Sequence, residues 1–266
     1  MISGNLGAGI KMLASSNNTV GYNLIGINAA GTAALPNAQD GVWLTSGSTN
    51  NTIGSSTFGE GQYIGGNGGA GVQITTSDSN NVRVSTRIGV GPTGALLGNG
   101  GGGVFLTNSA NNFVAPTLVA HNSGAGVAAI GLTSVNNFLS PFNVFDNTGL
   151  PVDLGNNGAT ANDPGDSDPG PNNLLNYPVI TAASGSVVTG TVCANCAVYI
   201  YAASGNPAAA GGGGSYLAAT NAIGVNWSTT LPGGRTKFDV TLQAYDGMNT
   251  SEFSPRPILF LPITRR

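Results

Sequence analysis

The acidic residues of this sequence are concentrated in one segment. Five of the eleven Asp and Glu residues lie within 23 residues, and no Lys or Arg occurs between Arg87 and Arg235 to neutralise them; the five are Asp146, Asp153, Asp163, Asp166 and Asp168. The stretch "DSDPGPN" alternates oxygen-bearing side chains with turn residues, as loops that wrap Ca²⁺ do, although it lacks the distal Glu of an EF-hand loop. We therefore predict a Ca²⁺ site at Asp163, Asp166, Asp168 and Asn172, with a flexible acidic linker as the alternative.

Acid–base catalysis has few candidate groups. The single His, His121, stands where Gly4 and Gly66 stand in other copies of a repeated segment, and Asp146 stands there one copy later. Stacked strands would bring this His and Asp about 5 Å apart; a polar surface turn is the alternative. No Ser nucleophile, paired carboxylate motif or metal-type His spacing accompanies the pair. The sequence favours a protein that is not an enzyme, with a polysaccharide lyase or hydrolase as the alternative.

The two cysteines form a "CANC" motif, Cys193 to Cys196. A CxxC motif serves in redox chemistry or as half of a zinc site, but there is no second CxxC and no following helix pattern. A disulfide that closes a hairpin in an oxidising compartment is the favoured interpretation.

Six short segments repeat along the N-terminal part of the chain and must position these groups. They begin at Asn5, Asn37, Asn67, Asn99, Asn122 and Asn147, and each continues through small or turn residues to Ile or Val; "NLGAGIKM" and "NGGAGVQI" are two of them. An Asn-Asn pair follows each of the first five copies, and an apolar or β-branched residue follows each pair. Repeats of 23 to 32 residues made of short strands and turns predict a parallel β-helix, a solenoid, over residues 1–155. Asn suits its left-handed turns, and stacked Asn side chains can form a hydrogen-bonded ladder.

One residue in each copy lies between two inward aliphatics and should face outward. Across the six copies this residue is Lys11, Trp43, Gln73, Phe105, Ala128 and Asp153. Trp43 and Phe105 would then be two aromatics on one exterior face, a candidate platform on which sugars stack. The alternative is that inserted loops fold over them.

Composition favours an extracellular or cell-surface protein whose solubility comes from Asn, Ser and Thr, because only 7% of residues are charged against a typical quarter. Eight Lys and Arg with a net charge of −3 exclude a basic nucleic-acid-binding face, and no apolar run is long enough for membrane insertion. The first residues lack the pattern of a signal peptide, so we expect an excerpt of a longer or processed chain.

The composition and the residue pattern of the chain change after the last repeat. Residues 156–178 are an acidic linker rich in Pro, Gly and Asn, and residues 179–256 alternate like the strands of a small antiparallel Ig-like β-sandwich. Residues 257–266 form an apolar tail, whose side chains Ile258, Leu259, Phe260, Leu261 and Ile263 are candidates for assembly. The tail could add a strand to a neighbour, complete its own sandwich or be an artefact of truncation.

The chain resembles the right-handed parallel β-helix proteins of bacterial secreted and cell-surface polypeptides. The resemblance rests on the "SGNLGAG"-like and "SNNTVGYNLIG"-like segments, the "AAGTAAL" insertion, the "DLGNNGATANDPGDSDPGPNNLLNYPV" linker and the terminal "AYDGMNTSEFS". It implies a right-handed all-β solenoid with a C-terminal sandwich. We expect a non-catalytic structural or adhesive surface protein that self-associates, head-to-tail or by strand addition, as a filament or sheath subunit; a polysaccharide-binding or polysaccharide-cleaving protein is the alternative.

Overall fold

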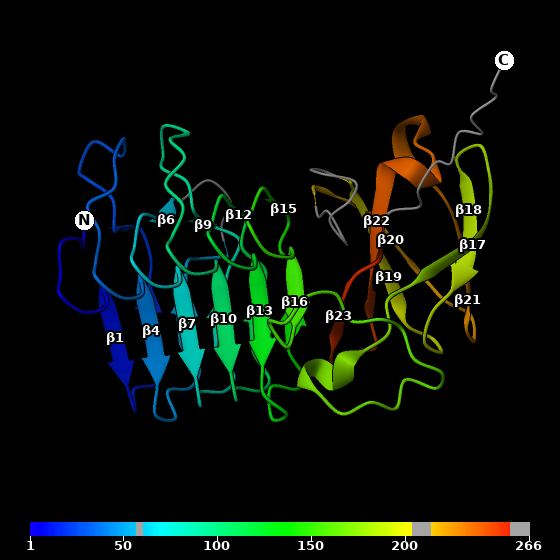
Figure 1. Cartoon of the computed structure of the whole chain (residues 1–266), viewed down its shortest axis with the longest axis horizontal. Coiled ribbons are helices and arrows are strands. Elements are labelled where there is room, and N and C mark those ends of the chain that lie inside the picture. The colour runs from blue at the N-terminus through cyan, green and yellow to red at the C-terminus, as the bar shows by residue number, and fades with distance from the viewer. Residues whose placement is uncertain (57–60, 204–213, 256–266) are drawn as a thin grey trace, which may run out of the picture.

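The structure is a computed structural model that describes residues 1–56, 61–203 and 214–255 (Figure 1). The described chain is all-β, with only three short 3₁₀ helices, η1 (Pro171–Leu174), η2 (Pro232–Gly234) and η3 (Lys237–Asp239). No helix in this part of the chain is long and apolar enough to cross a membrane. The predicted all-β class, with parallel sheets followed by antiparallel ones, is confirmed.

Three long parallel sheets make up the N-terminal part, and each takes every third strand along the chain. The first sheet, whose six strands stand side by side in Figure 1, contains β1 (Ile10–Leu13), β4 (Val42–Thr45), β7 (Val72–Thr75), β10 (Val104–Thr107), β13 (Val127–Ile130) and β16 (Val152–Leu154). The second contains β2 (Thr19–Val20), β5 (Thr52–Ile53), β8 (Asn81–Val82), β11 (Phe113–Val114) and β14 (Phe138–Leu139). The third contains β3 (Leu24–Ile25), β6 (Gln62–Ile64), β9 (Thr86–Ile88), β12 (Leu118–Ala120) and β15 (Val144–Phe145).

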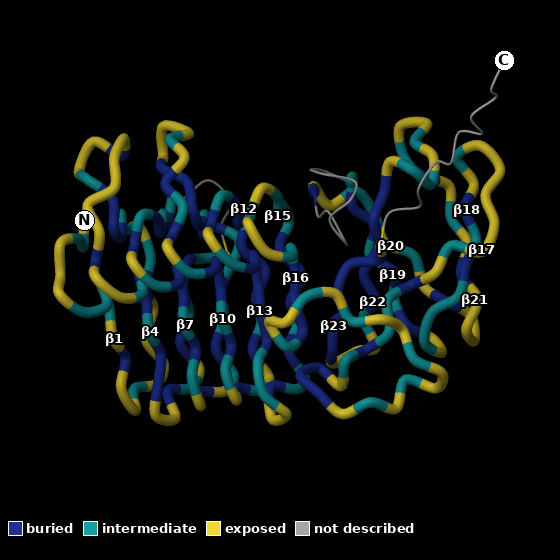
Figure 2. The backbone as a smooth tube through the Cα atoms, viewed as in Figure 1, coloured by how far each residue is buried: buried dark blue, intermediate teal, exposed yellow. Residues whose placement is uncertain are grey.

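Aliphatic side chains from all three sheets form one core. In each repeat the same positions point inward, so that Leu44, Ile74 and Leu106 are fully buried on successive strands of the first sheet. Figure 2 shows this buried interior running along the strands, while the turns at both ends are exposed. Each repeat therefore buries its apolar side chains against those of its neighbours, which explains why the chain repeats the same segment.

The C-terminal part contains two small antiparallel sheets. One pairs β17 (Val179–Ser184), β18 (Val187–Thr191) and β21 (Asn226–Thr230); the other pairs β20 (Tyr216–Asn221), β19 (Ala197–Ala202), β22 (Val240–Tyr245) and β23 (Thr250–Phe253). The two sheets share a second core, to which Val188 and Trp227 contribute from one sheet and Val198 and Leu242 from the other.

The antiparallel sheets and the parallel sheets are packed together. Tyr201 of β19 and Phe253 of β23 belong to the core of the parallel part, and their rings meet edge to face at 4.8 Å. Strand β23 lies beside β16, the last strand of the first parallel sheet (Figure 1). The far end of the parallel sheets is therefore covered by the C-terminal part.

Candidate functional site

Two ladders of Asn side chains run along the parallel part. In the first, Asn5, Asn37, Asn67, Asn99, Asn122 and Asn147 are linked, each Nδ2 donating to the next Oδ1 at 2.7–2.9 Å. The second links Asn18, Asn51, Asn80, Asn112 and Asn137 in the same manner. The residue before each rung of the second ladder has a left-handed backbone, for example Asn50 with φ 56° and Asn111 with φ 58°. The repeated Asn residues are therefore scaffold, as the repeat predicts.

The side chain of Asn172, a predicted metal ligand, is hydrogen-bonded within the fold. Its Oδ1 accepts a hydrogen bond from Asn137 N–H at 3.0 Å, and its Nδ2 donates to the carbonyls of Asn137 and Thr250 at 2.7 and 3.0 Å. The side chain is fully buried and continues the second Asn ladder beyond the last repeat. Thr250 lies on β23, so this amide joins the two parts of the protein.

The three aspartates of the predicted Ca²⁺ loop do gather in one place. Asp163, Asp166 and Asp168 each have a carboxylate oxygen within 4.8 Å of the others'. The Oδ1 atoms of Asp163 and Asp168 are buried and have no hydrogen-bond partner among the described residues. The second oxygen of Asp163 accepts from Ser167 N–H at 3.1 Å, which shapes the loop. Oxygen atoms that are buried without a donor are suited to a hard cation.

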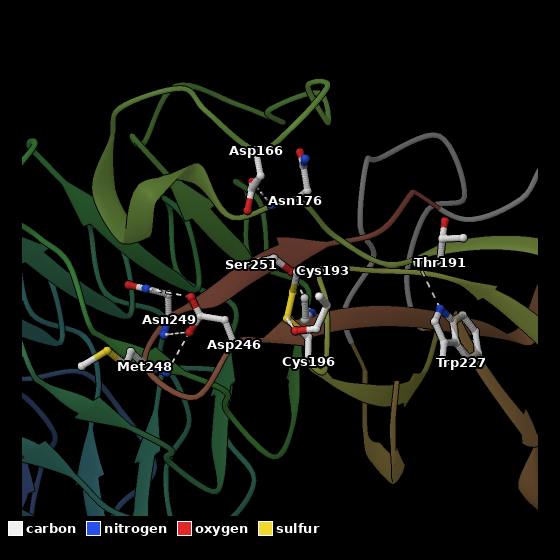
Figure 3. Close-up of a disulfide and its surroundings, with 12 residues drawn as sticks. Asp166, Asn176, Thr191, Cys193, Cys196, Trp227, Asp246, Met248, Asn249 and Ser251 are labelled. Atoms are coloured by element: carbon white, nitrogen blue, oxygen red, sulfur yellow. Dashed lines mark hydrogen bonds between the residues drawn. A yellow bond between two sulfur atoms is a disulfide. The ribbon is translucent and has the colours of Figure 1, made fainter. Parts of the chain in front are cut away.

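The electrostatics of this loop also involve the turn between β22 and β23. Burial raises the pKa of Asp166, and the negative charges of Asp163, Asp168 and Asp246 raise it further, against a hydrogen bond from Asn176 N–H at 2.8 Å. Asp246 lies in that turn, where it accepts hydrogen bonds from Met248 and Asn249 (Figure 3). Asp166 is thus repelled by three carboxylates that come from two segments distant in sequence.

The predicted outward row of the first parallel sheet exists in the structure. Strand pairing sets Lys11 beside Trp43, Trp43 beside Gln73, and Gln73 beside Phe105. Trp43 and Phe105 are half-buried, and Lys11 Nζ lies 4.0 Å from the centre of the Trp43 ring. Trp43 Nε1 is buried and has no hydrogen-bond partner in the described chain. The two aromatics share one face and are separated by one strand.

The far end of this row does not face solvent. Ala128 is fully buried, and Asp153 is only 5% exposed. Both carboxylate oxygens of Asp153 accept backbone hydrogen bonds, from Asn157 and Gly158 at 3.1 and 3.2 Å. Next to it, Glu252 of β23 is 4% exposed, and burial raises its pKa to about 7. The outer face of the sheet is therefore open only over its N-terminal strands.

His121 and Asp146 lie at equivalent turn positions, directly after the paired residues Ala120 and Phe145. Both have left-handed backbones, with φ values of 62° and 52°. The His121 ring meets Phe145 edge-on at 6.0 Å, and within the described residues it forms no ion pair. This geometry is that of stacked surface turns.

Cys193 and Cys196 are joined by a disulfide across the turn before β19 (Figure 3). Cys196 is buried, and its N–H donates to the Cys193 carbonyl at 3.2 Å. The predicted pairing is confirmed. A depression next to the disulfide is lined by Asp166, Tyr177 and Cys193, so the acidic loop lies beside this turn.

An aromatic cleft of about 380 Å³ lies where the second parallel sheet meets β19 and β20, and sequence reasoning missed it. Arg83, Phe113, Phe138, Phe142, Tyr199 and Tyr216 line it. Phe113 and Phe138 follow Asn-Asn pairs in consecutive repeats, a signal from which their stacking could have been predicted. The contribution of the tyrosines depends on how the C-terminal part docks, which no local pattern encodes.

In comparisons with known proteins, no family model and no curated protein matches this chain.

The predicted assembly residues of the apolar tail, Ile258, Leu259, Phe260, Leu261 and Ile263, lie outside the described residues.

Proposed function

We propose that this chain is a non-catalytic structural or adhesive module of an extracellular protein, built as a right-handed parallel β-helix followed by an Ig-like β-sandwich. The observation that carries this proposal is the pair of Asn ladders. They occupy the equivalent polar positions of every repeat with side chains that bind one another, and Asn172 extends the second ladder to β23. Such a molecule suits mechanical work, because its polar side chains hold neighbouring repeats together along the long axis.

An activity screen and a stability measurement test the structural role together. Purified protein is incubated with neutral and acidic polysaccharides, and reducing ends and unsaturated products are measured against a heat-denatured control. We expect no turnover, and we expect hydrogen exchange to protect the amides of the first parallel sheet and of β22–β23 to a similar degree. Product formation that is lost on substitution of one charged residue would establish an enzyme instead.

We also propose that Asp163, Asp166 and Asp168 hold one Ca²⁺ ion. Two buried oxygens without donors support this site, because they would be costly to leave unpaired. The cation would offset the mutual repulsion of the carboxylates and fix the linker against the β22–β23 turn that carries Asp246.

Calorimetric titration with Ca²⁺ alone tests the site. We expect a saturable heat, a thermal midpoint that rises with Ca²⁺, and the loss of both in Asp163→Asn and Asp168→Asn. Asp146→Asn is the matched control, because this exposed acid lies in the same acidic segment but outside the cluster. If Ca²⁺ gives no heat and leaves the midpoint unchanged, the loop is an acidic linker.

For assembly we propose strand addition rather than head-to-tail stacking. The last strand, β16, has its Leu154 N–H bound by the Glu252 carboxylate at 2.8 Å, so this end does not offer a free edge. Edges of sheets that lack a partner strand remain the natural sites for addition. Sedimentation velocity of the full chain and of a variant without residues 257–266 tests the tail's part: we expect the full chain alone to associate, and a monomeric full chain would exclude this mechanism.

Polysaccharide binding on the first sheet is a second candidate function. The observation that favours it is the shared face of Trp43 and Phe105, whose Cα atoms are two strand spacings apart, about 9.4–9.8 Å. Gln73 lies between them, and its Nε2 donates to Thr75 and Thr107 at 3.1 and 3.3 Å. Pull-down with insoluble polysaccharides should weaken in both Trp43→Ala and Phe105→Ala; equal retention of both variants and the parent would exclude this face.

A further inference from the structure

We propose that the aromatic cleft at the junction of the two parts is a binding site for a small aromatic carboxylate. This site is separate from the row of Trp43 and Phe105 and from the acidic loop, and the proposal is independent of the structural role. Clefts of about this size at the meeting of two structural units are where small ligands bind most often.

The cleft is predominantly apolar, and contacts between its aromatic rings hold these rings in place. Phe113 and Phe138 stack with ring centres 4.9 Å apart and planes at 6°. Beyond Phe138, Tyr199 and Tyr245 meet its ring nearly at right angles, at 6.0 and 5.2 Å. The site is therefore held in shape before any ligand arrives, which reduces the entropy cost of binding.

The edges of the stacked rings, rather than their faces, are left to contact a ligand. Arg83 lies 5.0 Å from the Phe113 ring centre, and Phe138 is stacked on the same ring. With both neighbours on its faces, Phe113 can present only its edge to the cleft. Ring edges carry partial positive charge, so they attract negative charge and pack well against the face of another ring. A flat, anionic aromatic molecule satisfies both preferences.

The described lining carries a single charged side chain. Arg83 is the only charged residue among the described residues of the lining, and it forms no ion pair or side-chain hydrogen bond with any of them. A guanidinium binds a carboxylate through two parallel N–H donors. The few hydroxyls in the lining include those of Tyr199 and Tyr216, whereas the Tyr201 hydroxyl is already bonded to Ser140. So few polar groups suit one carboxylate on an apolar ring better than a sugar with many hydroxyls.

Binding of naphthoate to the full chain tests the proposal, measured by calorimetry at neutral pH. We expect a Kd below about 1 mM, and Arg83→Gln should weaken binding about 10- to 100-fold, since a hydrogen-bonded charge is lost. Arg87→Gln is the matched control: Arg87 also lies over an aromatic ring, at 5.5 Å from that of Tyr63, but outside the cleft. This control should leave the Kd unchanged.

A second pair of variants separates ring from hydroxyl. Tyr216 is 40% exposed at the cleft, so Tyr216→Leu should weaken binding while the thermal midpoint stays near that of the parent, and Tyr216→Phe should bind as the parent does. Neutral naphthamide should bind much more weakly than naphthoate. The proposal is overturned if naphthoate does not saturate the protein, if naphthamide binds as tightly as naphthoate, or if Arg83→Gln and Arg87→Gln change the Kd equally. It is also overturned if glucuronate binds more tightly than naphthoate, because that result would mark a saccharide site.

Discussion

Replacement of Glu252 by Gln should remove most of the pH dependence of stability between about pH 5 and pH 8. Glu252 lies at the junction of the two parts, where Oε1 accepts from Leu154 N–H at 2.8 Å and Oε2 from Thr160 N–H at 2.9 Å. Burial raises its pKa from 4.5 to about 7, and the charge of Asp153 adds to this, while the hydrogen bonds oppose it. The folded protein therefore holds a proton that the unfolded chain releases.

The sign and the size of the effect follow from this difference in pKa. Because the folded-state pKa is raised, the stabilising contribution is complete below pH 4.5 and is lost as the pH rises through 7. The change corresponds to about 3 kcal/mol of unfolding free energy, at 1.36 kcal/mol for each unit of pKa. The parent should thus be less stable at pH 8 than at pH 5 by about that amount. The raised pKa values of Asp40 and Asp166 add a smaller slope of the same sign at the acidic end.

Urea unfolding at a series of pH values measures this directly. Glu252→Gln places an amide N–H against Thr160 N–H, so it should cost about 1–3 kcal/mol at pH 5 and leave the variant as stable as the parent, or up to about 2 kcal/mol more stable, at pH 8. Asp146→Asn, which removes an exposed charge, should keep the parent's profile. A parent whose unfolding free energy does not fall from pH 5 to pH 8, or a Glu252→Gln variant that retains the full slope, would refute the reasoning.

Three further predictions concern the scaffold, and urea unfolding checks each of them. Gly94→Ala should lower the free energy of unfolding by about 1–2 kcal/mol, because of its left-handed backbone alone. Gly89→Ala should lower it by about 1–3 kcal/mol more, because its Cβ would also overlap a carbonyl of the next repeat. Equal losses in the two variants would contradict this. Asn172→Ala should cost about 2–5 kcal/mol by leaving buried partners unpaired, and a neutral variant would show that the ladder is not continued there. Replacing Cys193 and Cys196 by Ser should cost only about 2 kcal/mol, since the disulfide closes a very short loop; loss of folding would contradict this.

The sequence predicts the parallel part well because the turns fix the register. Asn and Gly at equivalent turn positions leave one way to align the copies, and that alignment by itself places Lys11, Trp43, Gln73 and Phe105 in a row. Because successive side chains along a strand point to opposite faces of the sheet, the alignment then also decides which side chains face inward. The prediction fails at the end of the row, since Asp153 is buried by a loop and a sheet that come later in the chain.

Asn172 shows why the site is harder to predict than the fold. It belongs to an Asn-Asn pair followed by the apolar residue Leu174, and an Asn-Asn pair followed by an apolar or β-branched residue marks each rung of the second ladder. The surrounding acids favoured a metal ligand instead. An Asn in an oxygen-rich loop fits a metal site, and an Asn at the ladder spacing fits a ladder rung, so the sequence supported both roles for this one amide. The aromatic cleft was missed for a different reason: Tyr199 and Tyr216 reach Phe138 and Phe142 only through docking of the C-terminal sheets.

The junction accounts for the buried polar groups that the repeats themselves do not need. A stack of parallel strands ends in unpaired N–H groups and an open apolar cross-section, which invite aggregation unless they are covered. Here Phe253 and Tyr201 cover the apolar interior, Asn172 binds the last rung of the ladder, and Glu252 accepts the N–H of Leu154. These groups come from the linker, β19 and β23. The linker and the C-terminal part therefore act as a cap, in which each of these polar side chains binds a polar group at the end of the parallel sheets. Because Glu252 carries a proton below pH 7 and a charge above it, the strength of this cap depends on pH, and loosening it would expose the edge of β16.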